Sequence, residues 1–158
     1  MLVTDSTVGM TLANNGVLRV DTETDTGIVS AQRFTQSATG VTRMQLRGTV
    51  PGPGYDRLSV ATSAQLSGRL ELDELGGYDP AYLQPHEILR AGAVTGVFTG
   101  VPGNIITPTT YWAVTYDADS VFAIAALPGD ANLDGTVNIA DFAILASNFN
   151  TPGTWVNG

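Results

Sequence analysis

Apolar and polar side chains alternate along several short stretches of this chain. Leu70 and Leu72 alternate with charged residues between positions 69 and 73, and Met44 and Leu46 alternate with arginine and glutamine. A period of two places successive side chains on opposite faces of a strand. The pattern therefore predicts strands that have one buried face and one solvated face.

Two longer alternating runs, at 110–117 and 120–127, are separated by a short polar segment that contains Asp117 and Asp119. Two strand patterns joined by a tight polar turn predict a β-hairpin. Glycine and proline interrupt the chain at 50–55, 75–80 and 100–104, and the first long helical pattern begins at Ile139. Further strands are expected at 16–21, 27–34, 56–61, 87–92 and 94–100. The body of the chain is thus predicted to be all-β.

Short strands separated by glycine-rich breaks allow two architectures, a right-handed parallel β-solenoid and an antiparallel β-sandwich. Spacing alone does not separate them. Residues 54–103 carry the motifs YD-x-L-x-V, L-x-G-x-L-x-L and EIL-x-AG-x-V-x-G-x-F. On these motifs the segment 27–127 resembles autotransporter-associated β-strand repeat proteins, which are large bacterial surface or secreted proteins. The resemblance implies the end or cap of a β-solenoid with a scaffolding role, and it implies no catalytic residues.

Charge narrows the range of partners. The formal net charge is −8, all seven basic residues are arginine, and none follows Arg90. An acidic field repels phosphate backbones and attracts cations, so no nucleic-acid partner is expected. There is no cysteine and no apolar run long enough to span a membrane, and the first residues do not have the pattern of a signal peptide.

The acidic residues near the carboxyl end have a spacing suited to a metal ion. With Asp130 as the first position, oxygen donors fall at positions one, three, five, seven, nine and twelve of a loop, and Gly135 occupies position six. This is the spacing of an EF-hand calcium loop, in which glycine permits the sharp turn and alternate residues point at the ion. The alternative is a polar turn leading into a helix capped by Asn138. The predicted ligands of one Ca²⁺ are Asp130, Asn132, Asp134, Asp141, the Thr136 carbonyl, and Asn138 directly or through water.

The same stretch, GDANLDGTVNIADFAIL, is similar to one repeat of a type I dockerin. The resemblance implies a cohesin-like protein partner that contacts the helix, and it implies a second calcium-binding repeat. Only one repeat is present, and Gly158 corresponds in position to Gly129, so we expect a second repeat to begin just after residue 158. Ile139 and Ala140 stand where familiar type I dockerins often carry a Ser-Thr pair, which argues against an ordinary cellulosomal cohesin.

Other candidate residues favour structural roles. His86 is the only histidine, and Glu71, Asp73 and Glu74 lie together on one predicted strand. Trp112 and Tyr116 share a face with Val114, which favours core packing over sugar stacking, with Tyr111 on the opposite face. No nucleophile elbow, P-loop, dinucleotide fingerprint or zinc pattern is present, so no catalytic residue is predicted.

The sequence therefore predicts a β-solenoid end domain at 1–127, followed at 128–158 by an incomplete dockerin-like calcium loop and helix. The expected function is a non-catalytic adhesion or assembly module of a secreted or cell-surface bacterial protein. A polysaccharide or a cell-surface matrix is a further expected partner. The alternatives are an accessory portion of a polysaccharide-degrading enzyme and a carbohydrate-binding module.

Overall fold

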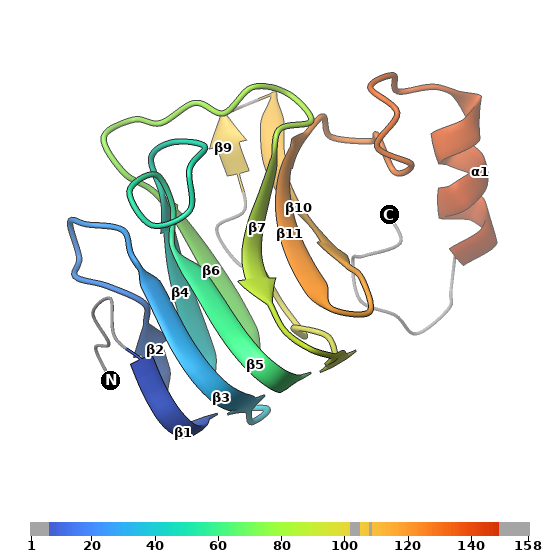
Figure 1. The fold of residues 1–158 in the computed structure, drawn as a ribbon. Coiled ribbons are helices and arrows are strands. Elements are labelled where there is room, and N and C mark those ends of the chain that lie inside the picture. Colours follow the sequence, from blue (N-terminus) through green and yellow to red (C-terminus); the bar gives the residue numbers. More distant parts are fainter. Residues whose placement is uncertain (1–6, 102–104, 108, 149–158) are drawn as a thin grey trace.

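The computed structural model describes residues 7–101, 105–107 and 109–148, and these form strands and one helix (Figure 1). In chain order the elements are β1 (Thr7–Asn14), β2 (Val17–Arg19), β3 (Ile28–Gln36), β4 (Val41–Leu46), β5 (Arg57–Leu66), β6 (Arg69–Glu74), β7 (Pro85–Arg90), β8 (Val94–Gly96), β9 (Ile105–Thr107), β10 (Thr110–Tyr116), β11 (Ser120–Ala126) and α1 (Ile139–Asn148). The all-β character predicted for the body is confirmed.

The strands form two sheets. The smaller sheet has the order β2-β4-β6 and is parallel, with Met44 opposite Leu72. The larger sheet has the order β1-β3-β5-β7-β11-β10-β9, and β8 also pairs with β5. The chain passes from one sheet to the other between β1 and β6, so consecutive strands there alternate between the two sheets.

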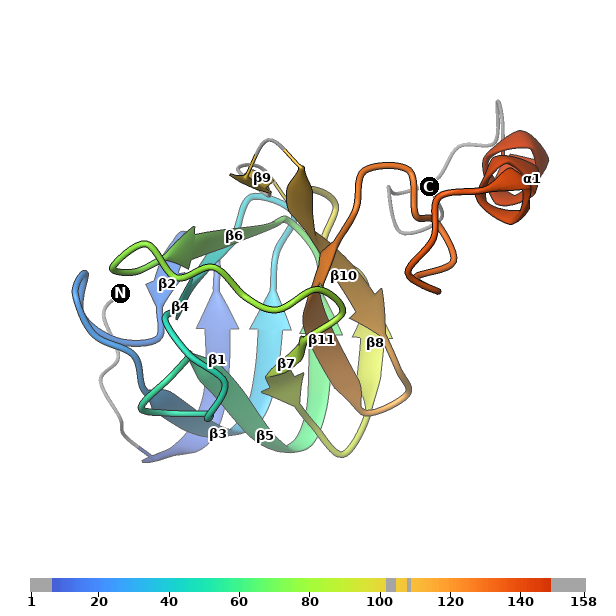
Figure 2. The ribbon, with the colours of Figure 1, turned by 90° about the horizontal axis from the view of Figure 1, so that it is seen from above.

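The prediction of a right-handed parallel β-solenoid is wrong. In a solenoid each strand lies parallel to its equivalent in the preceding coil. Here β11 pairs antiparallel with both β7 and β10, and β10 pairs antiparallel with β9, so the larger sheet is mixed. Parallel pairing does occur in β1-β3-β5 and in β2-β4-β6, where residues 41–46 pair with residues 69–74. The result is a curled mixed sheet beside a short parallel one (Figure 2).

The parallel strands also exclude a purely antiparallel sandwich. The hairpin predicted at the acidic turn is confirmed, because β10 and β11 pair antiparallel and the Asp117 N–H donates to the Ser120 carbonyl at 2.8 Å. The break from the parallel pattern thus occurs where β11 and β10 are added beside β7.

The inward-facing side chains of both sheets form one core. Its largest fully buried members are Leu18, Val20, Val29, Phe34, Met44, Leu46, Leu58, Leu70, His86, Ile88, Leu89 and Trp112. Burial alternates along the first four residues of β6 and of β4, as the period-two pattern predicts, whereas Gln45 in β4 is buried together with Met44 and Leu46.

Helix α1 lies apart from this core. It begins at Ile139, as predicted, and stands beyond the β10–β11 end of the larger sheet in both views (Figures 1 and 2). Asp141 is its only buried residue among 139–148. The domain division at residues 127 and 128 stays a prediction.

Candidate functional site

The candidate site is the loop that joins β11 to α1, here called the 130–141 loop. A turn introduces it, in which the Asp130 N–H donates to the Leu127 carbonyl at 3.0 Å. Gly135 has φ +96°, so the predicted positive φ at the sixth position of the loop is confirmed. Leu133 also adopts a left-handed conformation, with φ +57°. These two positions coil the backbone back toward Asp130.

Asp130 is fully buried and is the anchor of the loop. Its Oδ1 accepts the Asp134 N–H at 3.1 Å, and its Oδ2 accepts the Gly135 N–H at 3.1 Å. The Tyr82 hydroxyl, from the body, also donates to Oδ2. The first residue of the loop is therefore held by both the loop and the β body.

Asp141 closes the loop from the first turn of α1. It is 3% exposed, and its Oδ1 accepts the N–H groups of Ala131 at 2.8 Å and Asn132 at 3.2 Å. Its Oδ2 accepts the Asn138 N–H at 2.8 Å, while Asn138 Oδ1 accepts the Ala140 N–H at 2.8 Å. Asn138 thus caps α1 through the N–H of the second helical residue, and Asp141 supplies the return bond of a capping box, so the predicted cap at Asn138 is confirmed. Hydrogen bonds from these N–H groups, first that of Asn138, hold the Asp141 pKa below its ordinary value.

The remaining predicted ligands lie on the exposed side of the loop. Asp134 Oδ2 accepts from Asn132 Nδ2 at 2.8 Å, and Asp134 Oδ1 accepts the Thr136 N–H at 2.9 Å. The Thr136 carbonyl accepts from Asn138 Nδ2 at 3.1 Å. All six predicted ligands therefore belong to one compact loop, with their oxygens hydrogen-bonded inside it.

The described residues contain no group of three or more histidine, cysteine or acidic side chains arranged to hold a metal ion. In this loop the carboxylates of Asp130, Asp134 and Asp141 accept hydrogen bonds from backbone N–H groups. Asp130 Oδ1, Asp141 Oδ2 and both oxygens of Asp134 each accept one hydrogen bond, so each of them can still accept a second interaction.

The chemistry of the loop nevertheless fits a hard cation. Its donors are carboxylate, amide and carbonyl oxygens, which Ca²⁺ prefers. Among the described residues, no arginine or histidine forms an ion pair with Asp130, Asp134 or Asp141. Two of these three carboxylates are buried, and buried charge is normally paired or bound to a metal.

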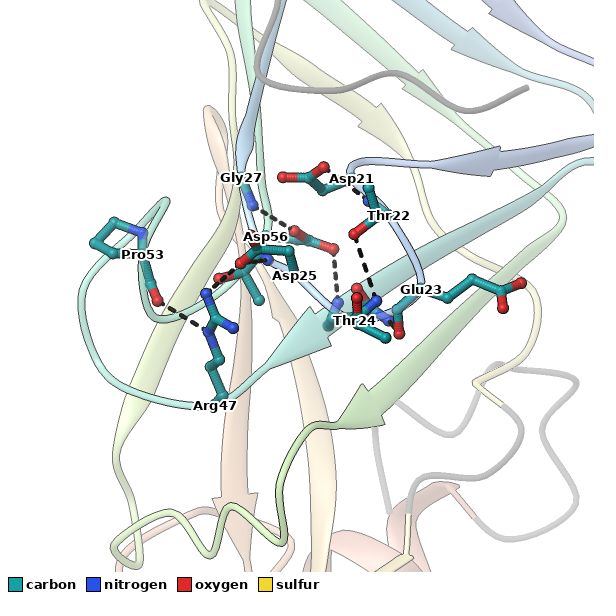
Figure 3. Close-up of polar contacts among 11 residues, drawn as sticks. Asp21, Thr22, Glu23, Thr24, Asp25, Gly27, Arg47, Pro53 and Asp56 are labelled. Carbon is teal, nitrogen blue, oxygen red and sulfur yellow. Dashed lines mark hydrogen bonds and ion pairs between the residues drawn. The ribbon is translucent and has the colours of Figure 1, made fainter.

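A second polar cluster, which sequence reasoning missed, lies where the segment between β2 and β3 meets the start of β5 (Figure 3). Asp56 is 1% exposed and accepts two N–H groups, from Gly27 at 2.8 Å and from Gln45 at 2.8 Å. Burial raises the Asp56 pKa to about 6 in spite of these bonds, and the charges of Asp21 and Asp25 raise it further. Asp56 thus joins three chain segments through one carboxyl group.

An exposed ion pair flanks this cluster. Arg47 bonds to the Asp25 carboxylate and to the Pro53 carbonyl, the latter at 3.2 Å (Figure 3). Because Arg47 neutralises Asp25 rather than Asp56, the buried carboxyl group has no ion-pair partner among the described residues.

The other side chains considered from the sequence occupy structural positions. His86 is fully buried, its Nε2 lies 3.0 Å from the Tyr78 hydroxyl, and its ring packs edge-on against Trp112. Glu71 pairs with Arg43.

Trp112 is 1% exposed and donates to Glu74, so it cannot serve as a flat sugar-stacking platform. Tyr111 and Tyr116 are only partly exposed.

Within the described residues, no helix is long and apolar enough to cross a membrane. Comparisons of this chain with models of protein families, with curated proteins and with solved structures find no match.

Proposed function

We propose that this chain is a non-catalytic assembly module whose 130–141 loop binds one Ca²⁺ and thereby fixes α1 for attachment to a protein partner. The observation that carries the proposal is the pair of buried carboxylates, Asp130 and Asp141, in an oxygen-rich loop that has no cationic partner among the described residues. The resemblance of the loop to a dockerin repeat supports the same conclusion.

The residues that would hold the ion are Asp130, Asn132, Asp134, Asp141 and the Thr136 carbonyl, with Asn138 capping the helix or acting through water. Bound calcium supplies two positive charges to a loop that carries three carboxylates. The Asp141 carboxylate also accepts the N–H of Asn138, the residue that precedes α1, so an ion that orders this carboxylate stabilises the start of the helix. No second loop of this spacing is present in the sequence, so we expect a dissociation constant of about 10⁻⁵ M or weaker.

The attachment surface is the apolar side of α1. Ile139, Phe142 and Leu145 are 77%, 62% and 47% exposed and recur every three residues along the helix. Residues at this spacing lie near one another on a helix. Exposed apolar groups of this kind suit a protein partner, and the dockerin resemblance points to a cohesin-like one. A secreted or cell-surface location belongs to the same proposal.

Calorimetric titration with CaCl₂ tests the metal half of the proposal. The parent chain should bind one equivalent, and Asp134→Ala should abolish binding because it removes an exposed carboxylate of the loop. Asp79→Ala is the matched control, since Asp79 is an exposed acid of the β body. Equal binding by the parent and by Asp134→Ala would rule out this loop as the site.

No observation favours the alternative of an accessory portion of a polysaccharide-degrading enzyme. The carbohydrate-binding alternative depended on exposed aromatic rings, and Trp112 is buried.

A further inference from the structure

We infer that Tyr82 is a positioning residue for the cation site and that it couples metal binding in the 130–141 loop to the β body. The inference rests on the proposed calcium function. It concerns a residue far from the loop in sequence, which no spacing pattern identifies.

The contact between Tyr82 and the loop has a polar part and an apolar part. The Tyr82 hydroxyl donates to Asp130 Oδ2, the same oxygen that accepts the Gly135 N–H at 3.1 Å. A Cβ atom placed on Gly135 would lie 3.6 Å from Tyr82 Cε1 and 3.7 Å from Leu83 Cδ1. Asp130 and Gly135, the first and sixth residues of the loop, therefore both lie against the segment that contains Tyr82 and Leu83.

The segment that carries Tyr82 is itself fixed to the larger sheet. Leu83 has φ +60°, and its N–H donates to the Ala125 carbonyl of β11 at 2.8 Å. The Gln84 N–H closes a turn onto the Ala81 carbonyl at 2.9 Å, and β7 begins at the next residue. Strand β11 also precedes the 130–141 loop in the chain. The segment that carries Tyr82 is therefore hydrogen-bonded to the same strand from which the loop continues.

Groups that hydrogen-bond to a metal ligand fix its orientation, and their loss typically weakens metal binding about 10- to 100-fold. Tyr82 and the Gly135 N–H hold Oδ2 of Asp130, while the Asp134 N–H holds Oδ1. A tyrosine hydroxyl keeps its proton at neutral pH, because its ordinary pKa is about 10. The hydroxyl is thus a permanent donor to the first ligand position.

The test compares Tyr82→Phe with Tyr116→Phe. The control also removes one hydroxyl from the β body, where Tyr116 accepts the Phe98 N–H at 3.2 Å. Calorimetry with CaCl₂ should show about tenfold weaker binding for Tyr82→Phe and parent-like binding for Tyr116→Phe. Saturating CaCl₂ should raise the urea midpoint of the β body, followed by tryptophan fluorescence, in the parent and in Tyr116→Phe but much less in Tyr82→Phe.

A third readout needs no metal. In EGTA, the amide hydrogens of Asp134 and Gly135 should exchange faster in Tyr82→Phe than in the parent, because Asp130 loses its hydrogen bond to the β body.

The outcomes separate the inference from the proposed function. If the parent binds calcium, and Tyr82→Phe binds it within twofold of the parent with an unchanged shift of the urea midpoint, the inference is wrong and the proposed function stands. If the parent does not bind calcium, both are wrong.

Discussion

Asp56 gives the β body a stability that should increase as the pH falls from 7 to 5. Its pKa is raised from 3.8 to about 6, so the folded state takes up the proton before the unfolded chain does. A shift of this size corresponds to about 3 kcal/mol between the two protonation states. The stability contributed by Asp56 is therefore gained as the pH falls through 6, and it is complete only below 3.8, the pKa in the unfolded chain. Between pH 7 and pH 5 the gain should be about 1 kcal/mol.

The assay is urea unfolding of the parent and of Asp56→Asn at pH 7 and pH 5. The amide can accept one of the two N–H groups but presents a donor to the other, which should lower stability at both pH values by about 1–3 kcal/mol. Titration of the groups that do not interact with Asp56 cancels in the difference between parent and variant. That difference should be about 1 kcal/mol larger in favour of the parent at pH 5. A difference that is constant, or that shrinks at pH 5, would show that the two N–H bonds outweigh burial.

Three further outcomes test other parts of the structure. Asp141→Ala removes the acceptor of three N–H groups and should cost about 2 kcal/mol of local stability. In EGTA the amide hydrogens of residues 142–148 should therefore exchange about 30-fold faster than in the parent. Unchanged exchange would contradict the capping role. Burial lowers the His86 pKa below 6.5, so the unfolded chain takes up a proton at this residue more readily than the folded protein. The parent should therefore lose stability relative to His86→Gln as the pH falls from 7 to 5. Urea midpoints of the two proteins that do not diverge would refute this. Gly68 has φ +63°, and Gly68→Ala would place a Cβ atom 2.3 Å from the Gly40 carbonyl oxygen, so urea unfolding should show a loss of about 3 kcal/mol. In the control Gly16→Ala the Cβ atom would have nothing within 4 Å, and stability should change by less than about 0.5 kcal/mol. Similar losses in both variants would contradict the steric argument.

The sequence was most informative where the determinants are local. Alternation at Leu70 and Leu72 predicts β6, because a strand needs only its own side chains to show which face is buried. The loop and cap were predictable for the same reason, since Asn138, Asp141 and Gly135 lie within one short segment.

Long-range arrangement was not predictable in this way. The sequences of β7 and β11 show the usual alternation of a strand, and neither sequence indicates that the two strands pair antiparallel. The solenoid prediction rested on short strands, glycine-rich breaks and a family resemblance, and it is wrong where β11 pairs antiparallel with β7 and β10. Tyr82 and Asp56 were missed because their partners lie 48 and 11–29 residues away. A hydrogen bond across such separations leaves no spacing pattern.

Calcium binding by the 130–141 loop is the central claim, and an NMR titration of the parent chain with CaCl₂ tests it most directly. Saturable changes at one equivalent should be confined to the amides of residues 130–141, the first turn of α1 and Tyr82. The amide of Gly135 should move strongly, because it donates to Asp130. An absence of saturable changes in the loop, or one-equivalent changes centred elsewhere in the chain, would contradict the account.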